Sequence, residues 1–168
     1  LKIAVTLLVA LPKGNGFEEI IRPCTELGVS TLMPVISDRT LLKPSLHKGE
    51  RWQKIATEAA EQSERQWVPE ILEPCSFKEA LINLKDWRSE AYICVTRRDS
   101  PLLWSCLETQ QPHRLLIATG PEGGWTDTEI EQAIAVGFKP VSLGKRILRA
   151  TTAPTVVMSL VANFAELR

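Results

Sequence analysis

The feature that most constrains the fold is a repeated alternation of short apolar runs with segments of helical periodicity. The apolar runs predict strands, and the intervening segments carry apolar stripes at helical spacing. Strands separated by helices form parallel sheets that are covered on both faces. We therefore predict an α/β fold with a mostly parallel sheet, helices on both faces and a ligand at the carboxyl ends of its strands. The predicted strands are 3–11, 31–36, 70–73, 91–96, 115–119 and 139–143, and the predicted helices are 17–27, 52–65, 76–87, 102–107, 126–136 and 154–167.

Two of the predicted helices begin with a capping box, in which a hydroxyl and a carboxylate three residues later satisfy free backbone N–H groups. Ser76 with Glu79 forms one, and Thr126 with Glu129 forms the other. Pro23 lies inside the first predicted helix, where it removes a backbone donor and is expected to kink the helix.

Length, charge and cysteine spacing narrow the class of protein. The 168 residues suit one domain, and their formal net charge of zero argues against a protein that holds nucleic acid by bulk charge. No apolar run is long enough to cross a bilayer, and the opening run predicts a strand, not a signal peptide. The cysteines form no C-x-x-C pair and have only His47 and His113 as companions, so we expect no metal site and free thiols in a cytoplasmic protein. They are Cys24, Cys75, Cys94 and Cys106.

A glycine-rich loop, Thr119 to Gly124, joins the strand at 115–119 to a capped helix. Residues without a Cβ allow a backbone to approach a ligand closely. The loop matches neither G-x-G-x-x-G nor a P-loop, and the charge of Glu122 within it would repel a phosphate. A cationic or neutral ligand is expected, or a Glu122 that holds the loop by accepting N–H bonds. The alternative is a plain strand-to-helix turn.

A second loop, Leu143 to Ala153, also follows a strand. It alternates apolar Leu143, Ile147 and Leu148 with cationic Lys145, Arg146 and Arg149. The apolar side chains are expected to line an adenine pocket while the cations face an anionic substrate. A packed connection whose charges point to water is the alternative.

Two further groups of polar residues have either a functional role or side chains that simply face solvent. The spacing of Glu58, Gln62 and Arg65 places them on one face of a helix, where the first two would orient the arginine. The first third of the chain is locally basic, and its cations are candidates for phosphate contacts. They are Lys13, Arg39, Lys43, Lys48 and Arg51.

Together these segments resemble the RsmE family of the SPOUT superfamily, the uridine N3-methyltransferases of small-subunit ribosomal RNA. The resemblance covers nearly the whole chain. It is carried by LPKGNGFEEII, TELGV, RWQKIATEAAEQSERQWVPEI, GPEGGWTDTEIEQA and LGKRILRATTA. The resemblance implies a catalytic domain over 1–168 with a C-terminal deep trefoil knot, S-adenosylmethionine as methyl donor, and 16S ribosomal RNA of the small subunit as partner. It also implies a homodimer whose interface includes the last helix, where an apolar arc is wide enough for burial on two sides. That arc comprises Val156, Val157, Leu160, Val161 and Phe164.

The resemblance places the cofactor in the two loops. The implied cofactor-binding residues are Thr119, Gly120, Pro121, Glu122, Gly123, Gly124, Ser142, Leu143, Gly144, Ile147, Leu148, Thr152 and Ala153. Methylation at uracil N3 removes a proton and builds negative charge on the ring, which a nearby cation stabilises. Arg149 and Arg146 are therefore the first catalytic candidates, and Arg65 is the third.

The chain departs from the family pattern in three ways. The usual N-terminal PUA-like RNA-binding domain is absent from it, Thr151 replaces a usual glutamate, and Pro23 lies near a usual lysine. These departures leave open an inactive SPOUT module for RNA binding or ribosome assembly, or a methyltransferase that acts on another RNA. A nucleotide-binding α/β domain that uses the glycine loop for phosphate is a further alternative.

Overall fold

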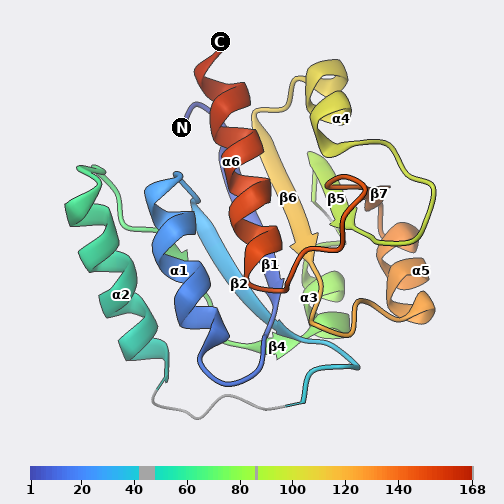
Figure 1. The fold of residues 1–168 in the computed structure, drawn as a ribbon, viewed down its shortest axis with the longest axis horizontal. Helices are drawn as coiled ribbons and strands as arrows, with labels where there is room; N and C mark the ends of the chain where they lie inside the picture. The colour runs from blue at the N-terminus through green and yellow to red at the C-terminus, as the bar shows by residue number, and fades with distance from the viewer. Residues whose placement is uncertain (42–47, 86, 168) are drawn as a thin grey trace.

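The computed structural model describes residues 1–41, 48–85 and 87–167 as alternating strands and helices (Figure 1). Lys43 and His47, named above for phosphate and metal contacts, lie outside the described residues. Within the described ranges, no group of three or more histidine, cysteine or acidic side chains is placed to hold a metal ion. No described helix is long and apolar enough to span a membrane.

Seven strands form one sheet in the order β3-β2-β1-β6-β5-β7, with β4 paired to β2. All the recorded strand pairs are parallel, as predicted, and in the central strand Val9 lies opposite Pro34 of β2 and Thr119 of β6. Because the strands are parallel, their carboxyl ends meet at one edge. The strands are β1 Ala4–Ala10, β2 Thr31–Ile36, β3 Glu70–Ile71, β4 Cys75–Ser76, β5 Glu90–Cys94, β6 Arg114–Thr119 and β7 Lys139–Val141.

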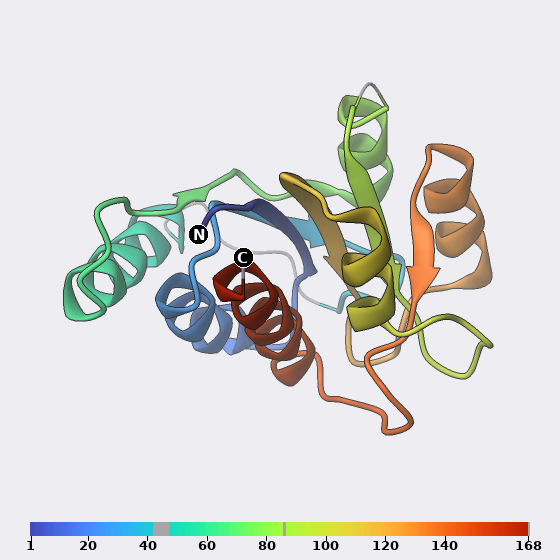
Figure 2. The same cartoon turned by 90° about the horizontal axis from the view of Figure 1, so that it is seen from above.

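Helices cover both faces of this sheet, which confirms the predicted fold class (Figure 2). On one face, Val5, Leu7 and Val9 of β1 pack into an apolar cluster with residues of α1, α4 and α6. On the other face, Leu8 and Ala10 pack with residues of α3 and α5. Successive side chains of β1 therefore point to opposite faces of the sheet, and both sets are buried under a layer of helices. The helices are α1 Gly16–Glu26, α2 Lys48–Gln62, α3 Phe77–Asn83, α4 Leu103–Gln110, α5 Asp127–Ala135 and α6 Thr152–Glu166.

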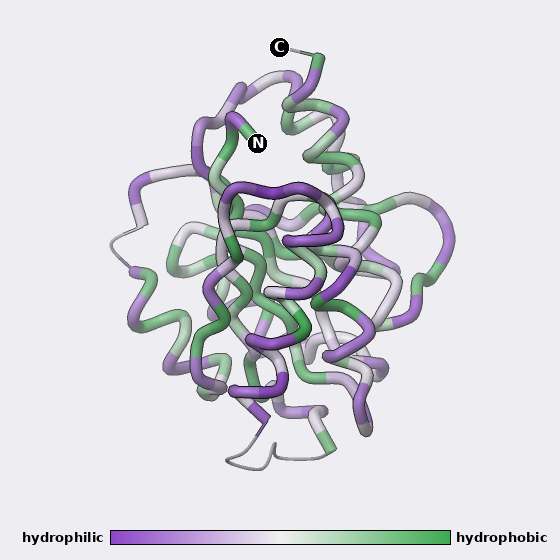
Figure 3. Tube along the Cα trace, turned by 90° about the vertical axis from the view of Figure 1, so that its left-hand side faces the viewer, coloured by the Kyte–Doolittle hydropathy of each residue, from purple (hydrophilic) through white to green (hydrophobic). Residues whose placement is uncertain are grey.

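Buried apolar segments form the interior of the chain, while polar segments follow its outer turns (Figure 3).

Both capping boxes are present, at Ser76 and at Thr126. Helix α1 continues through Pro23 to Glu26, so the proline does not end it. Pro23 lies in the last turn, where one missing backbone donor interrupts little of the helix.

The predicted single face of Glu58, Gln62 and Arg65 is wrong. Helix α2 ends at Gln62, and Glu64 takes a left-handed φ of 56°. The chain has therefore left the helix before Arg65, whose backbone N–H returns to the Ala60 carbonyl at 2.9 Å. Residues three or four positions apart share a face only within a continuous helix, so the spacing does not predict where the Arg65 side chain points.

Candidate active site

A cavity of about 360 Å³ opens at the carboxyl edge of the sheet, where the loops after β5, β6 and β7 converge. Its volume lies within the range of sites that bind small molecules. Both loops singled out in the sequence contribute to its wall. The predicted cofactor-binding residues that line it are Gly120, Pro121, Glu122, Gly123, Gly124, Leu143, Gly144, Ile147, Leu148 and Ala153.

The other three predicted cofactor-binding residues do not line this cavity. Thr119 is buried, and its hydroxyl lies 3.4 Å from the Leu8 carbonyl oxygen. The Ser142 hydroxyl accepts a hydrogen bond from the Gly144 N–H at 3.1 Å, so it shapes the loop. Thr152 is the exposed first residue of α6.

The three predicted catalytic arginines lie in different places. Arg146 lines the cavity, whereas Arg149 lines an adjoining cavity of about 520 Å³. Arg65 lies at the other edge of the sheet, where its guanidinium donates to the carbonyls of Thr25 at 2.7 Å and Val29 at 2.9 Å. Burial lowers the pKa of Arg65. The structure therefore brings Arg146 and Arg149 to the site and gives Arg65 partners elsewhere.

The glycine loop is a tight turn that is tied to the loop after β1. The Gly124 N–H donates to the Pro121 carbonyl at 2.8 Å, and Gly124 has a φ of 72°. The Glu122 carboxylate accepts a hydrogen bond from the backbone N–H of Lys13 at 2.9 Å. One of the two roles considered for Glu122, holding a loop by accepting an N–H bond, is thus present in the structure.

Several residues of the cavity wall were not assigned to it from the sequence. The carboxyl-edge rule pointed to the loop after β5, but no motif marks that loop. Arg39 was proposed for phosphate, yet its guanidinium donates to the Gly123 carbonyl. These lining residues are Arg39, Cys94, Val95, Thr96, Arg97, Arg98, Trp125, Asp127, Ile130 and Ala150.

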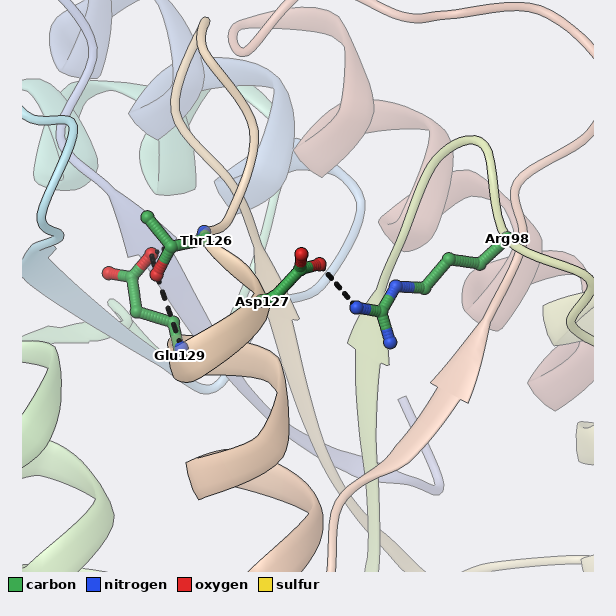
Figure 4. A network of polar contacts seen from close by, with 4 residues as sticks. All are labelled: Arg98, Thr126, Asp127 and Glu129. Carbon is green, nitrogen blue, oxygen red and sulfur yellow. Dashed lines mark hydrogen bonds and ion pairs between the residues drawn. The ribbon is translucent and has the colours of Figure 1, made fainter.

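Hydrogen bonds and an ion pair at the start of α5 stabilise one side of the cavity (Figure 4). Arg98, from the loop after β5, forms an ion pair with Asp127 of α5. Glu129 completes the capping box with Thr126 and is only 3% exposed. The cap that starts α5 therefore also carries part of the cavity wall.

Trp125 contributes its ring to the cavity wall. Its ring stacks on Phe77, with centroids 4.4 Å apart, and a Cβ added at Gly120 would lie 3.1 Å from its Nε1. This Nε1 has no hydrogen-bond partner among the described residues. A buried indole N–H normally has a partner, but the surrounding protein atoms close this donor to solvent, so Trp125 contributes ring surface and not a hydrogen bond to the cavity.

The remaining wall is largely apolar. Val95, Ile130, Leu143 and Leu148 contribute aliphatic surface. Burial raises the pKa of the Cys94 thiol to about 12, so this side chain is neutral near pH 7 and adds to the apolar surface. Apolar walls with a few polar groups and exposed glycine backbone are typical of sites for a small organic ligand.

A family model for the RNA methyltransferase domain matches residues 1–162, so the chain belongs to the RNA methyltransferase domain family. It is 57% identical over 167 residues to ribosomal RNA small subunit methyltransferase E of Synechocystis sp.. It is 37% identical over 175 residues to the protein of the same name from Bacillus subtilis. The resemblance to the RsmE family is thereby confirmed.

A solved structure shares this fold. The crystal structure of ribosomal RNA small subunit methyltransferase E from Neisseria gonorrhoeae, bound to S-adenosyl methionine, has a TM-score of 0.85 and 34% sequence identity. The match covers 96% of this chain and 66% of that one. Sequence matches cover 99% of this chain but 55% of the Synechocystis relative and 68% of the Bacillus relative.

Proposed function

We propose that this chain is the catalytic domain of an S-adenosylmethionine-dependent methyltransferase that methylates N3 of a uridine in 16S ribosomal RNA. One observation carries the proposal: the two loops with the RsmE-like motifs form a common cavity at the carboxyl edge of the sheet. The names of the Synechocystis and Bacillus relatives, and the S-adenosyl methionine in the Neisseria structure, support the same activity.

The cavity has the chemistry that this cofactor requires. The aliphatic side chains and the neutral Cys94 suit an adenine ring. Asp127 is paired with Arg98, so Glu122 is the carboxylate of this wall that is left to favour a cationic ligand, beside the arginines that also line it. Residues 120–124 and 143–148 would hold the cofactor, which when bound supplies an activated methyl group.

The chain's cations would stabilise the charge that develops on uracil as N3 loses its proton. Arg149 and Arg146 are both exposed and line the two adjoining cavities, so we propose these two for that task. Arg65 is no longer a catalytic candidate, because its guanidinium donates hydrogen bonds to the carbonyls of Thr25 and Val29.

The partners follow from the same proposal. The small ribosomal subunit would be the substrate, and the reaction would take place in the cytoplasm. The half-buried Val156 and Leu160 of α6 are available for a homodimer interface, while Val157, Val161 and Phe164 are buried in the chain's own core. The trefoil knot remains a prediction of the family resemblance.

The test is methylation of small subunits from a strain that lacks this activity, followed by mass spectrometry of the 16S ribosomal RNA. We expect the full-length protein to produce N3-methyluridine and Arg149→Ala to lower turnover without changing calorimetric affinity for S-adenosylmethionine. Cofactor binding without methyl transfer would instead identify an inactive module. A methylated transfer RNA would identify another substrate, and stabilisation by a nucleotide but not by S-adenosylmethionine would identify a nucleotide-binding domain.

A further inference from the structure

We propose that the adjoining cavity is the subsite for the target uridine nucleotide and that Glu122, in the wall between the two cavities, accepts the N3 proton. This inference rests on the proposed methyltransferase function. The adjoining cavity has a volume of about 520 Å³ and is lined by residues after β1 and by the loop before α6. It shares four residues with the first cavity, namely Glu122, Ile147, Leu148 and Ala150.

The proposal requires the two cavities to hold their reactants side by side, and their common lining residues mark where the two would come together. The attacking nitrogen and the methyl carbon must come within about 3–3.5 Å of each other and in line. A cofactor in the first cavity and a base in the second would meet at Glu122, Ile147 and Leu148, three of the four residues common to both. A single open cavity would offer no such division of the two reactants.

The second cavity has the surface that a pyrimidine nucleotide requires. Ile147 is 64% exposed although it is aliphatic, so it offers an apolar face to a base at the junction. Lys13 and Arg149 are exposed cations on the same cavity and suit a phosphate or a uracil carbonyl oxygen. The acidic members of the wall are Glu19 and Glu122.

Glu122 is both fixed and available. Its Oε1 accepts the Lys13 N–H at 2.9 Å, which holds the carboxylate at the junction. Oε2 has no hydrogen-bond partner in the described part of the chain, and the residue is exposed. An ionised carboxylate with a free oxygen can accept a proton from a group placed beside it.

The N3 proton passes to Oε2 of Glu122, while the N3 electron pair forms the bond to the methyl carbon. The methyl–sulfur bond breaks, and its electron pair stays on the sulfur as a neutral thioether. Arg149 stabilises the charge on the ring carbonyls during this transfer. Glu122 then returns its proton to water.

The first experiment separates proton acceptance from loop support. Glu122→Gln keeps an oxygen for the Lys13 N–H but cannot take the proton at neutral pH. We expect kcat on small subunits to fall by about 100-fold or more, with the Tm and the calorimetric affinity for S-adenosylhomocysteine, which carries no sulfonium charge, unchanged. Lys54→Met, a cation outside both cavities, is the matched control and should keep wild-type kcat. Wild-type kcat in Glu122→Gln, or a loss of affinity for S-adenosylhomocysteine, would overturn the proposed role.

The second experiment locates the nucleotide without measuring activity. Uridine 5′-monophosphate is titrated into the full-length protein saturated with S-adenosylhomocysteine, and backbone amide shifts are followed by NMR. Shifts at Asn15 and Thr151, which line the second cavity and not the first, are expected, and Ile147→Ala should weaken them. Shifts confined to Thr96 and Asp127 of the first cavity, or none at millimolar nucleotide, would overturn the subsite. If wild-type protein neither binds the cofactor nor methylates RNA, the proposed function fails; if it does both and these tests fail, the inference alone fails.

Discussion

The Oε1 atom of Glu129 accepts a hydrogen bond from the backbone N–H of Asp38 at 2.9 Å. Its Oε2 accepts the Thr126 N–H at 2.8 Å, so one buried carboxylate joins the cap of α5 to the loop after β2. Arg39, the next residue in that loop, reaches the Gly123 carbonyl of the glycine loop. A helix cap thereby helps to position the proposed cofactor site.

Glu129→Ala should therefore affect both stability and cofactor binding. It leaves two backbone donors without their acceptor, at a cost of about 2 kcal/mol in the free energy of unfolding. It also releases the loop that carries Arg39, so affinity for S-adenosylmethionine should fall. Denaturant unfolding and calorimetry measure the two effects. Glu79→Ala is the matched control, because it breaks the other capping box, at Ser76, away from the cavity. Equal cofactor affinity in the two variants would contradict the coupling.

Gly144 and Gly137 form a second matched pair. Their φ values are 119° and 104°, and an added Cβ would meet nothing within 4 Å at either position. Alanine at each should cost about 1–2 kcal/mol of stability through backbone strain alone. Gly144 lines the cavity, whereas Gly137 follows α5, so Gly144→Ala alone should weaken cofactor binding. Unaltered cofactor affinity in Gly144→Ala would argue against the assigned position of this loop.

Arg65→Ala tests a structural role for this arginine. The substitution removes two charge-assisted hydrogen bonds to the carbonyls of Thr25 and Val29. We expect the free energy of unfolding to fall by about 2 kcal/mol, with kcat per folded molecule preserved. Arg22→Ala, which breaks an exposed ion pair with Glu58 at 3.7 Å, should cost less than about 1 kcal/mol. A lowered kcat in folded Arg65→Ala would restore the catalytic hypothesis.

Burial raises the pKa of the Cys24 thiol from 9.0 to about 12, which gives stability a specific pH dependence. A pKa that is raised by folding favours the neutral thiol in the folded state. The resulting stability is complete below pH 9 and is lost as the pH rises from 9 towards 12, by up to about 1.4 kcal/mol per pH unit. Urea unfolding from pH 8 to 11 should show a shallower decline in Cys24→Ala than in the wild type. Parallel curves would show that Cys24 does not contribute.

Strand and helix positions were readable from the sequence because burial imposes the periodicities of strands and helices. The run through Val5, Leu7 and Val9 and the capping boxes at Ser76 and Thr126 all predicted elements that are present. The two-residue strand β4 was missed, since so short a pairing leaves no periodicity. Helix α2 begins at Lys48, before the apolar stripe at Trp52 that had marked it.

The candidate site was only partly predictable. Glycines and alternating charges marked the loops at 120–124 and 143–153, and most of their named residues line the cavity. Arg98 and Trp125 were missed, because their roles depend on Asp127 and Phe77, partners that spacing along the chain does not reveal. Arg65 was misplaced for the same reason, since its acceptors lie near the end of α1 and before β2.

The contact between Lys13 and Glu122 joins residues separated by 109 positions. Central strand β1 likewise pairs with β6, so β1 must wait for a strand that lies far later in the chain. Folding dominated by such distant pairings is slow, because each requires a large loop to close. A nascent chain therefore cannot assemble the two cavities until residues up to 153 have emerged from the exit tunnel. We expect a stalled chain truncated before Leu143 to remain unable to bind the methyl donor.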